Sequence, residues 1–365
     1  MKILHLINDL GSGGAEKLLT DILPIMKEEG HEVSLIILNQ NNSLSFYKEK
    51  LETIGVRVID FKKSFYSPIN IFYLIQLLKK EGYDIVHAHL FPSFYHLAVA
   101  SLFISKKTKL FYTEHSVTNN RRKYISLKLL DKWVYNKYDR IICITDVVKK
   151  RLNEWINESW KSVVINNGVN LKEISSAHKN IIEEDYNFIN FNKKNLLMVG
   201  RFNLAIKNQE CLVKAFTLLD DTYHLYFVGI GDGVDDIKNL CTQLDIDNRV
   251  FFLGLRTDVY QLMHLVDLNI LSTHYEGLSG VALEGLASGK PFIGSDVEGV
   301  KEAVPNKDFL FPDDNPQVLA DTIQKVLNDK AISDYLVSEG LKFVENYSID
   351  KMALSYLYVY KEILN

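Results

Sequence analysis

Short apolar runs rich in β-branched residues alternate with segments of helical period along the first half of the chain. The runs are Ile3–Ile7, Val33–Leu38, Ile85–Ala88, Leu110–Thr113 and Ile141–Ile144, and the clearest helical patterns are Ala15–Glu28 and Ile69–Lys80. Neighbouring parallel strands need a crossover connection, which is usually a helix. The alternation therefore predicts an α/β fold with a parallel sheet and helices on both of its faces.

The same rhythm restarts after a polar stretch at Asn170–Lys194. The later apolar runs are Leu196–Val199, Leu225–Val228, Val250–Leu253, Leu268–Leu271 and Pro291–Gly294. A chain of 365 residues is long enough for two domains of ordinary size. We predict two Rossmann-like, doubly wound parallel-sheet domains, residues 1–169 and 170–348, with a C-terminal helix in 349–365 that packs back on the first. Ligands of such sheets bind at the carboxyl ends of strands, so two facing domains would enclose a cleft.

Composition excludes several other classes of protein. The longest apolar-looking run, Phe91–Ile104, contains polar residues and is shorter than the roughly 20 residues of a membrane-spanning helix. The first ten residues lack the features of a signal peptide, so we expect a cytoplasmic protein. The three cysteines, Cys143, Cys211 and Cys241, are far apart in apolar segments. We expect them to be reduced core residues, not zinc ligands or disulfides.

Charge is distributed unevenly between the halves. Residues 1–168 contain 24 Lys and Arg against 17 Asp and Glu, whereas the remainder contains 18 against 29. The excess of cations predicts that the first half meets an anionic partner. Basic residues gather near three tryptophans, Trp133, Trp155 and Trp160: they are Arg121, Arg122, Lys123, Lys128, Lys132, Lys137, Lys149, Lys150 and Arg151. This combination could hold the protein against an anionic membrane, at about 1 kcal/mol per near-surface cation. The alternative is a solvated helix face. The net charge of −4 and the lack of a recognition motif argue against nucleic acid.

The densest group of chemically useful residues lies between Ser272 and Pro291. A strand ends there, a loop with glycines follows, and a helix is predicted to open near Gly280, with Glu276 in the loop and Glu284 in the early helix. Free N–H groups at a helix N-terminus bind anions. A carboxylate further along the helix suits a diol. The alternative is that Glu276 and Glu284 are ordinary solvated acids.

With its neighbours in order along the chain, this segment resembles glycosyltransferase family 4, whose members carry two glutamates at this spacing in such a loop and helix. The resemblance covers nearly the whole sequence. The other matching segments are Gly13-Gly14-Ala15-Glu16, Asp84-Ile85-Val86-His87-Ala88-His89, Thr113-Glu114-His115-Ser116, Val199-Gly200-Arg201-Phe202 with Lys207-Asn208, Phe227 to Gly233, and Phe252 to Asp258. The resemblance implies a GT-B fold and a retaining transferase that uses a nucleotide sugar.

It also implies roles for individual residues. The catalytic candidates are Glu276, His115, Arg201 and Lys207. The donor-binding candidates are Gly13, Gly14, Arg201, Lys207, Arg256, Glu276, Gly277, Leu278, Ser279 and Glu284. In this scheme Arg201 and Lys207 stabilise the leaving diphosphate. Glu284 accepts hydrogen bonds from the ribose hydroxyls, and Glu276 lies by the sugar. The backbone amides of Gly277 to Ser279 line the sugar and the phosphates.

We expect no metal and no cofactor, because no Asp-x-Asp motif stands in a suitable loop and two fixed cations can replace a divalent ion. The expected partners are a nucleotide sugar, a UDP-sugar by default with a GDP-sugar as the alternative, and a saccharide or lipid-linked acceptor of surface polysaccharide synthesis. Two other functions remain open: a sugar-nucleotide epimerase of the same fold, and a non-catalytic subunit that binds nucleotide sugar. The Gly229-x-Gly231-x-Gly233 motif is weak evidence for a dinucleotide, because it does not open a first βαβ unit.

Overall fold

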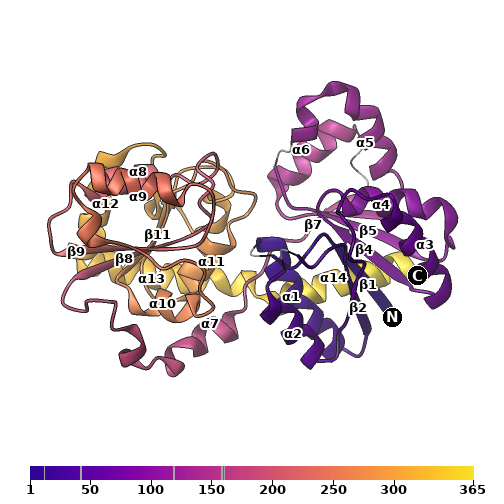
Figure 1. The fold of residues 1–365 in the computed structure, drawn as a ribbon, viewed down its shortest axis with the longest axis horizontal. Helices are drawn as coiled ribbons and strands as arrows, with labels where there is room; N and C mark the ends of the chain where they lie inside the picture. Colours follow the sequence, from indigo (N-terminus) through magenta and orange to yellow (C-terminus); the bar gives the residue numbers. More distant parts are fainter. Residues whose placement is uncertain (12, 42, 118–119, 158, 160) are drawn as a thin grey trace. The chain divides into compact units, whose positions relative to one another are not determined.

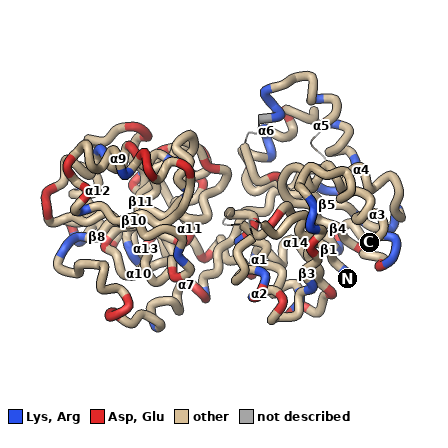
Figure 2. Tube along the Cα trace, in the orientation of Figure 1, with Lys and Arg blue, Asp and Glu red and all other residues tan. Residues whose placement is uncertain are grey.

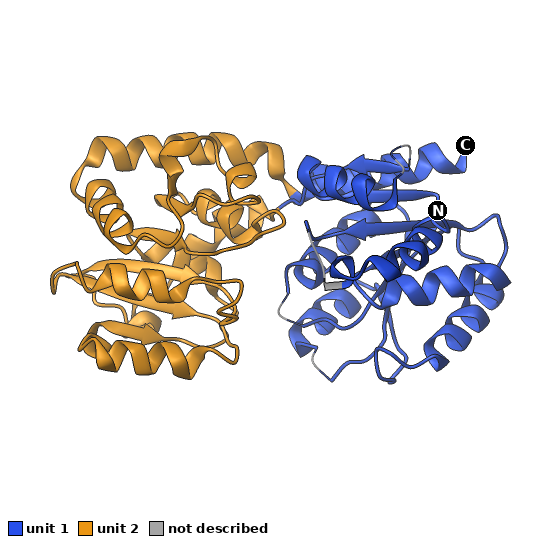
Figure 3. Ribbon diagram, turned by 90° about the horizontal axis from the view of Figure 1, so that it is seen from above, with its two compact units in different colours: residues 1–168, 349–365 blue, residues 169–348 orange. Residues whose placement is uncertain are grey.

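The computed structural model describes residues 1–11, 13–41, 43–117, 120–157, 159 and 161–365. They form two compact units (Figures 1 and 3). Unit 1 comprises residues 1–168 and 349–365, and unit 2 comprises residues 169–348. The chain therefore leaves unit 1 after Gly168 and returns to it at Ile349.

Unit 1 is built on a seven-stranded sheet in the order β3-β2-β1-β4-β5-β6-β7, with every pairing parallel. Its strands are β1 (Lys2–Ile7), β2 (Glu32–Ile37), β3 (Arg57–Asp60), β4 (Ile85–His89), β5 (Lys109–Glu114), β6 (Arg140–Cys143) and β7 (Ser162–Val164). Its helices are α1 (Gly14–Glu28), α2 (Ser45–Thr53), α3 (Ile69–Glu81), α4 (Ser93–Ala100), α5 (Lys128–Tyr135), α6 (Asp146–Ile156) and α14 (Ile349–Leu364). The central strands β1 and β4 are buried on both faces, so the residues they carry are apolar apart from Lys2 and the three histidines His5, His87 and His89.

Unit 2 repeats the architecture with a six-stranded parallel sheet in the order β10-β9-β8-β11-β12-β13. Its strands are β8 (Lys194–Val199), β9 (Tyr223–Val228), β10 (Val250–Phe252), β11 (Leu268–Leu271), β12 (Phe292–Ser295) and β13 (Leu310–Phe311). Its helices are α7 (Leu171–Ala177), α8 (Gln209–Phe216), α9 (Val234–Gln243), α10 (Val259–Leu265), α11 (Gly280–Ala287), α12 (Pro316–Asn328) and α13 (Lys330–Val344). The prediction of two parallel-sheet α/β domains is confirmed.

The C-terminal helix α14 belongs to the core of unit 1. It packs along α1, and its apolar face joins the buried cluster that includes residues of β1 and β2. Tyr356 and Tyr360 are fully buried in this cluster. Figure 3 shows α14 in the colour of unit 1, although unit 2 precedes it in sequence.

Polar caps set where the unit 2 helices begin. Asn208 caps α8 by accepting a hydrogen bond from the Cys211 N–H at 3.1 Å, and Ser279 caps α11 in the same way through Ala282. Such caps stabilise a helix by about 1 kcal/mol. They fix the ends of the loops that follow β8 and β11, where the candidate site lies.

Two further predictions can be compared with the structure. Cys143, Cys211 and Cys241 are free and buried, as expected of core residues. Among the described residues, no helix combines the length and the apolar character needed to cross a bilayer.

Candidate active site

The segment Ser272–Ser279 joins β11 to α11 at the carboxyl end of the unit 2 sheet. Ser279 ends it as the N-cap of α11, with φ −75° and ψ 104°, and its Oγ accepts a hydrogen bond from the Ala282 N–H at 3.3 Å. The first N–H groups of a helix have no acceptor inside the helix, so a corner of this kind presents backbone donors to an anion. The helix predicted to open near Gly280 is confirmed, with Gly277 and Leu278 in the loop before it.

The loop that follows β8 is hydrogen-bonded along this segment. Lys207 and Thr273 form an isolated antiparallel bridge, and the His274 N–H donates to the Ile206 carbonyl at 2.8 Å. Two strand-end loops that are far apart in sequence are thereby held side by side.

This pairing brings two of the predicted charged residues into contact. The Lys207 Nζ donates to Glu276 Oε1, and only 13% and 17% of the two side chains are exposed. Charges shielded in this way are less screened by salt than a surface pair. Lys207 and Glu276 thus form a shielded ion pair beside the N-terminus of α11.

Gly299 holds the backbone of Glu276 in place. It has φ +83°, and a Cβ built on it would lie 2.5 Å from the Glu276 carbonyl oxygen. Its own carbonyl accepts a hydrogen bond from the Ser279 N–H at 3.1 Å. No side chain fits between these two backbones, so Gly299 is a functional position that the sequence analysis missed.

Glu284 projects from α11 and meets a residue of α10. The Tyr260 hydroxyl donates to Glu284 Oε1 at 3.0 Å. A hydroxyl that donates to one carboxylate oxygen orients the carboxylate while leaving lone pairs for a ligand. Tyr260 was also missed from sequence, because nothing in the α10 sequence points to a partner on α11.

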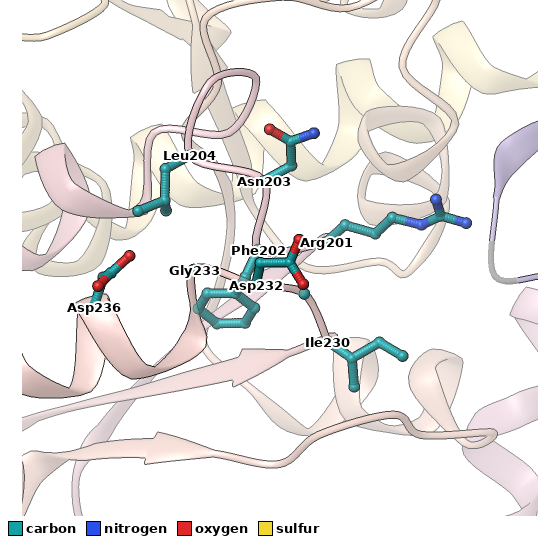
Figure 4. Close-up of a pocket in the computed structure, with 9 residues that line it drawn as sticks. Arg201, Phe202, Asn203, Leu204, Ile230, Asp232, Gly233 and Asp236 are labelled. Atoms are coloured by element: carbon teal, nitrogen blue, oxygen red, sulfur yellow. The ribbon is translucent and has the colours of Figure 1, made fainter.

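Arg201 lies in the loop after β8 and lines a pocket of about 450 Å³. Figure 4 shows its guanidinium extended away from Leu204 and Asp236 on the far side of this pocket. The residue is exposed, and its guanidinium has no hydrogen-bond or ion-pair partner within the described parts of the chain. It is a cation available to an anionic ligand.

The glycines after β9 explain how this loop is held. Gly231 has φ +153°, and a Cβ on it would lie 2.5 Å from the Phe202 carbonyl oxygen. The Phe202 N–H donates to the Ile230 carbonyl at 3.0 Å, and the Gly233 N–H donates to the Phe202 carbonyl at the same distance. The Gly-x-Gly-x-Gly motif therefore lets the Arg201 loop approach the β9 loop.

Arg256 follows β10 and is already paired. Its Nε and Nη2 donate to the two carboxylate oxygens of Asp258 at 2.8 and 2.5 Å. A bidentate pair of this kind holds the guanidinium in one orientation. Its role in donor binding stays a prediction.

The unit 1 candidates Gly13 and Gly14 lie at the start of α1. Gly13 is the N-cap, with φ −89° and ψ 163° and no side-chain cap, and Gly14 is the first helical residue. Gly14 is exposed and Gly13 is half-buried, and their role in donor binding stays a prediction.

His115 follows β5 and is partly buried. Its Nε2 lies 3.3 Å from His89 Nδ1, and burial lowers its pKa to about 4. The imidazole is therefore neutral at physiological pH. His87 and His89, which belong to β4, are both buried.

His5, His87 and His89 each place one nitrogen within 4.8 Å of the others, close enough for a metal ion. However, His87 is hydrogen-bonded through Nδ1 to the Tyr360 hydroxyl and through Nε2 to the Thr113 hydroxyl, at 2.5 and 2.8 Å. His5 Nδ1 lies 3.0 Å from His89 Nε2. These contacts explain the cluster as a hydrogen-bonded network.

The basic face predicted in unit 1 needs correction at Arg121 and Arg122. Arg122 pairs with the buried Glu114 at 2.9 Å, and Arg121 lies 3.4 Å from the fully buried Asp131. Both guanidiniums hold the loop inside the unit, because a buried carboxylate needs a partner. Trp160, a further member of that face, lies outside the described residues.

Two family models together match most of the chain. The model of Glycosyltransferase Family 4 matches residues 12–173, and the model of glycosyl transferases group 1 matches residues 180–343. The chain belongs to glycosyltransferase family 4. It is therefore a glycosyltransferase, and the epimerase and non-catalytic alternatives are not favoured.

Individual relatives extend over nearly the whole chain. It is 25% identical over 356 residues to an Escherichia coli UDP-Gal:alpha-D-GlcNAc-diphosphoundecaprenol alpha-1,3-galactosyltransferase, covering 93% of this chain and 91% of the relative. It is 25% identical over 367 residues, covering 94% of each chain, to a Campylobacter jejuni N,N'-diacetylbacillosaminyl-diphospho-undecaprenol alpha-1,3-N-acetylgalactosaminyltransferase. Anabaena Alr3699/HepE, solved with UDP and glucose, has a similar fold, with TM-score 0.86, 21% identity, and coverage of 99% of this chain and 100% of that one.

Proposed function

We propose that this family 4 enzyme transfers a hexose or N-acetylhexosamine from a UDP-sugar to a hydroxyl of a lipid-linked saccharide, with retention at the anomeric carbon and without a metal. The observation that carries the proposal is the Lys207–Glu276 pair beside the N-terminus of α11, together with Glu284 of α11, which accepts a hydrogen bond from Tyr260 of α10. The group offers cations and amides to a diphosphate and carboxylates to hydroxyls.

The cations act on the leaving group. Breaking the bond between the sugar and the diphosphate builds negative charge on the phosphate, so a fixed cation stabilises the transition state more than the ground state. Arg201, exposed, and Lys207, oriented by Glu276, are the cations in this role. They take the place that a divalent metal has in other transferases.

The carboxylates and amides bind the rest of the donor. Glu284, oriented by Tyr260, accepts hydrogen bonds from the ribose hydroxyls, and Glu276 accepts from the sugar. Backbone N–H groups of Gly277 and Leu278 line the sugar and the phosphates, whereas the Ser279 N–H is already bonded to the Gly299 carbonyl. Each hydrogen bond to a charged group contributes about 1.5–3 kcal/mol. The UDP assignment is supported by the E. coli relative, whose name specifies UDP-galactose.

Retention follows from attack on the face that the diphosphate leaves. The acceptor hydroxyl oxygen bonds to the anomeric carbon while the bond from that carbon to the diphosphate oxygen breaks, and the leaving oxygen takes the hydroxyl proton. Glu276 is occupied by Lys207, so we assign it to binding and not to covalent attack.

Two observations support the proposal that the acceptor lies at the inner face of the cell membrane. The E. coli and C. jejuni relatives are named for diphosphoundecaprenol-linked acceptors. In this chain, one face of α5 and of the turn before it is apolar and exposed: Ile125 is 74% exposed and Leu129 80%, with Trp133 one helical turn further on. Side chains at this spacing share one face of a helix.

Cations surround this apolar face. Lys137 Nζ lies 4.8 Å above the Trp133 ring, and Lys128 and Lys132 belong to α5 itself. Figure 2 shows Lys and Arg on both α5 and α6. An apolar face ringed by lysines fits an anionic bilayer, where apolar side chains enter the interface and cations meet lipid headgroups. We propose that α5 docks the enzyme on the cytoplasmic leaflet.

Transfer assays with a matched set of donors test the proposed activity. The purified enzyme would be incubated with UDP-glucose, UDP-galactose, their N-acetylhexosamine counterparts and GDP-mannose, together with a polyprenyl-diphosphate-linked saccharide. We expect UDP release and an α-linked product from an α-linked donor, unchanged by EDTA.

Three results would overturn parts of this scheme. An inverted anomer would exclude retention, and activity lost in EDTA but restored by Mg²⁺ would exclude the role given to Arg201 and Lys207. Isomerisation of a nucleotide sugar without an acceptor would indicate an epimerase.

A further inference from the structure

A line of histidines runs from the interior of unit 1 to the carboxyl end of its sheet. His5 on β1 lies 3.0 Å from His89 on β4, measured from Nδ1 to Nε2. His89 in turn lies 3.3 Å from His115 after β5, measured from Nδ1 to Nε2. His5 and His89 are fully buried, whereas His115 is partly exposed at the end of the line.

All three rings are neutral at physiological pH. Burial lowers the pKa of His5 to about 3 and that of His115 to about 4, and it lowers the pKa of His89 well below the ordinary value. A neutral imidazole carries one N–H and one acceptor nitrogen. Each ring in the line must therefore donate at one end and accept at the other.

This condition leaves two arrangements for the whole line. In the first, His5 Nδ1–H donates to His89, and His89 Nδ1–H donates to His115 Nε2, so that the proton of His115 lies on Nδ1. In the second, every donor and acceptor is reversed, and His115 Nδ1 is a bare acceptor. The state of the exposed ring is thus tied to that of the deepest one.

The environment of His5 Nε2 decides between the two proton arrangements. This atom is buried and has no hydrogen-bond partner among the residues that the structure describes. The second arrangement would place a proton on it and leave an orphaned N–H, which is rarer in protein interiors than an under-used acceptor. The first arrangement leaves only an unused lone pair there.

We propose that His5 and His89 are positioning residues that fix His115 as the Nδ1–H tautomer, so that it serves as a hydrogen-bond donor and not as a base. The inference rests on the proposed function for its ligand, an oxygen of the nucleotide sugar. That oxygen belongs either to the sugar or to the diphosphate, and both accept the same hydrogen bond. His115 Nδ1 has no hydrogen-bond partner among the described residues and is available for it.

Nitrogen-15 NMR of the full chain labelled at histidine measures the tautomers directly, because protonated and bare ring nitrogens differ strongly in chemical shift. Signals would be assigned with His5→Phe, His89→Phe and His115→Phe. We expect a protonated Nδ1 and a bare Nε2 at His5, His89 and His115. A protonated Nε2 on His115 in the unaltered protein would overturn the proposal without reference to any variant.

Substitution of His5 tests the coupling. His5→Phe should mix the tautomers of His115 and weaken UDP-sugar binding roughly threefold to tenfold, the effect of one hydrogen bond. His5→Asn, which keeps an N–H close to the position of Nδ1, should restore both. The matched control is His87→Phe, because His87 is equally buried but bonded to Tyr360 and Thr113 instead. An equal change of the His115 tautomer in His87→Phe would show a general structural effect and overturn the proposal.

Affinities for UDP and for the UDP-sugar identify the oxygen. If His115→Phe weakens both equally, the acceptor is a phosphate oxygen; if it weakens only the UDP-sugar, the acceptor belongs to the sugar. If it weakens neither, the ligand role of His115 is wrong. The tautomers are measured on the protein without substrate. The result therefore tests the tautomer proposal independently of the glycosyl-transfer assay.

Discussion

Lys207 and Glu276 come from loops about seventy positions apart, and their contact depends on the bridge between Lys207 and Thr273. The carboxylate keeps the ammonium in one place before the substrate arrives. A cation held in this way stabilises a developing phosphate charge without reorganisation during the reaction.

We therefore expect Lys207→Met to lower kcat by roughly 10²–10³-fold, the usual effect of removing one preorganised group that stabilises transition-state charge. The measurement is steady-state transfer with saturating donor, accompanied by a thermal melt to show that the fold is intact.

Lys214→Met is the matched control. Lys214 forms an ion pair with Glu210 at 2.6 Å on the exposed face of α8, in the same unit. Exposed pairs contribute little, so the control should keep its rate within about twofold. Equal losses in the two variants would contradict the role assigned to Lys207.

At this scale, the sequence predicts side chains whose chemistry is visible in a motif and misses those that act through packing. Glu276, Glu284 and Lys207 stand in recognisable loops. Gly299 matters because the backbone of Glu276 lies against it, and Tyr260 matters because it donates a hydrogen bond to Glu284 on the neighbouring helix α11. Those relations exist only once the sheet has brought distant segments together.

At the scale of elements, α5 exposes apolar side chains on its outward face. Its inward face buries Asp131, Val134 and Tyr135, while Leu129 and Trp133 point outward. A large exposed apolar face on a protein of this size marks an interaction site.

For α5, we predict that Leu129→Glu reduces binding to phosphatidylglycerol-containing vesicles roughly tenfold to a hundredfold, since one leucine side chain leaves the interface and a negative charge replaces it. Flotation of the whole enzyme with vesicles measures the effect, and high salt should weaken the binding of the unaltered protein.

Leu341→Glu is the comparison variant, because Leu341 is an exposed leucine of α13 in unit 2. It should bind vesicles like the unaltered protein. Failure of the unaltered enzyme to float with anionic vesicles at low salt would end the proposal.

The strands that the sequence analysis overlooked share one position in the fold. β3, β7 and β13 each lie at the edge of a sheet. An edge strand is covered less completely than a central one, so it needs less apolar sequence and can be shorter. The central strands, buried on both faces, carry the continuous apolar runs that made the fold class predictable.

For the whole molecule, α14 is the element that joins the two ends of the chain in one core. Its Tyr360 hydroxyl contacts His87 Nδ1 at 2.5 Å, and its Tyr356 hydroxyl lies 3.1 Å from the Thr113 hydroxyl. Removal of 349–365 would strip the apolar cover from α1 and leave these buried groups unpaired.

We expect the truncated chain to lose the cooperative unfolding of unit 1, seen as a missing transition in calorimetry and as rapid proteolysis within residues 1–168. Tyr360→Phe isolates the polar part, because the ring remains and only the hydroxyl is lost. It should lower the free energy of unfolding by about 1–3 kcal/mol, the cost of leaving a buried partner unsatisfied. A truncated chain as stable as the full one would show that α14 is dispensable.

Because α14 belongs to unit 1 but follows unit 2 in sequence, the two units can be completed in the reverse of the order in which their synthesis begins. Domains generally fold as units, beginning with the one that leaves the ribosome first. Here unit 2 is contiguous and can finish as soon as Ser348 has emerged, whereas unit 1 must wait for residues 349–365. Unit 1 is translated first but completed last. Until α14 arrives, the apolar residues of α1 that it covers stay exposed, and these are the residues that chaperones have to protect.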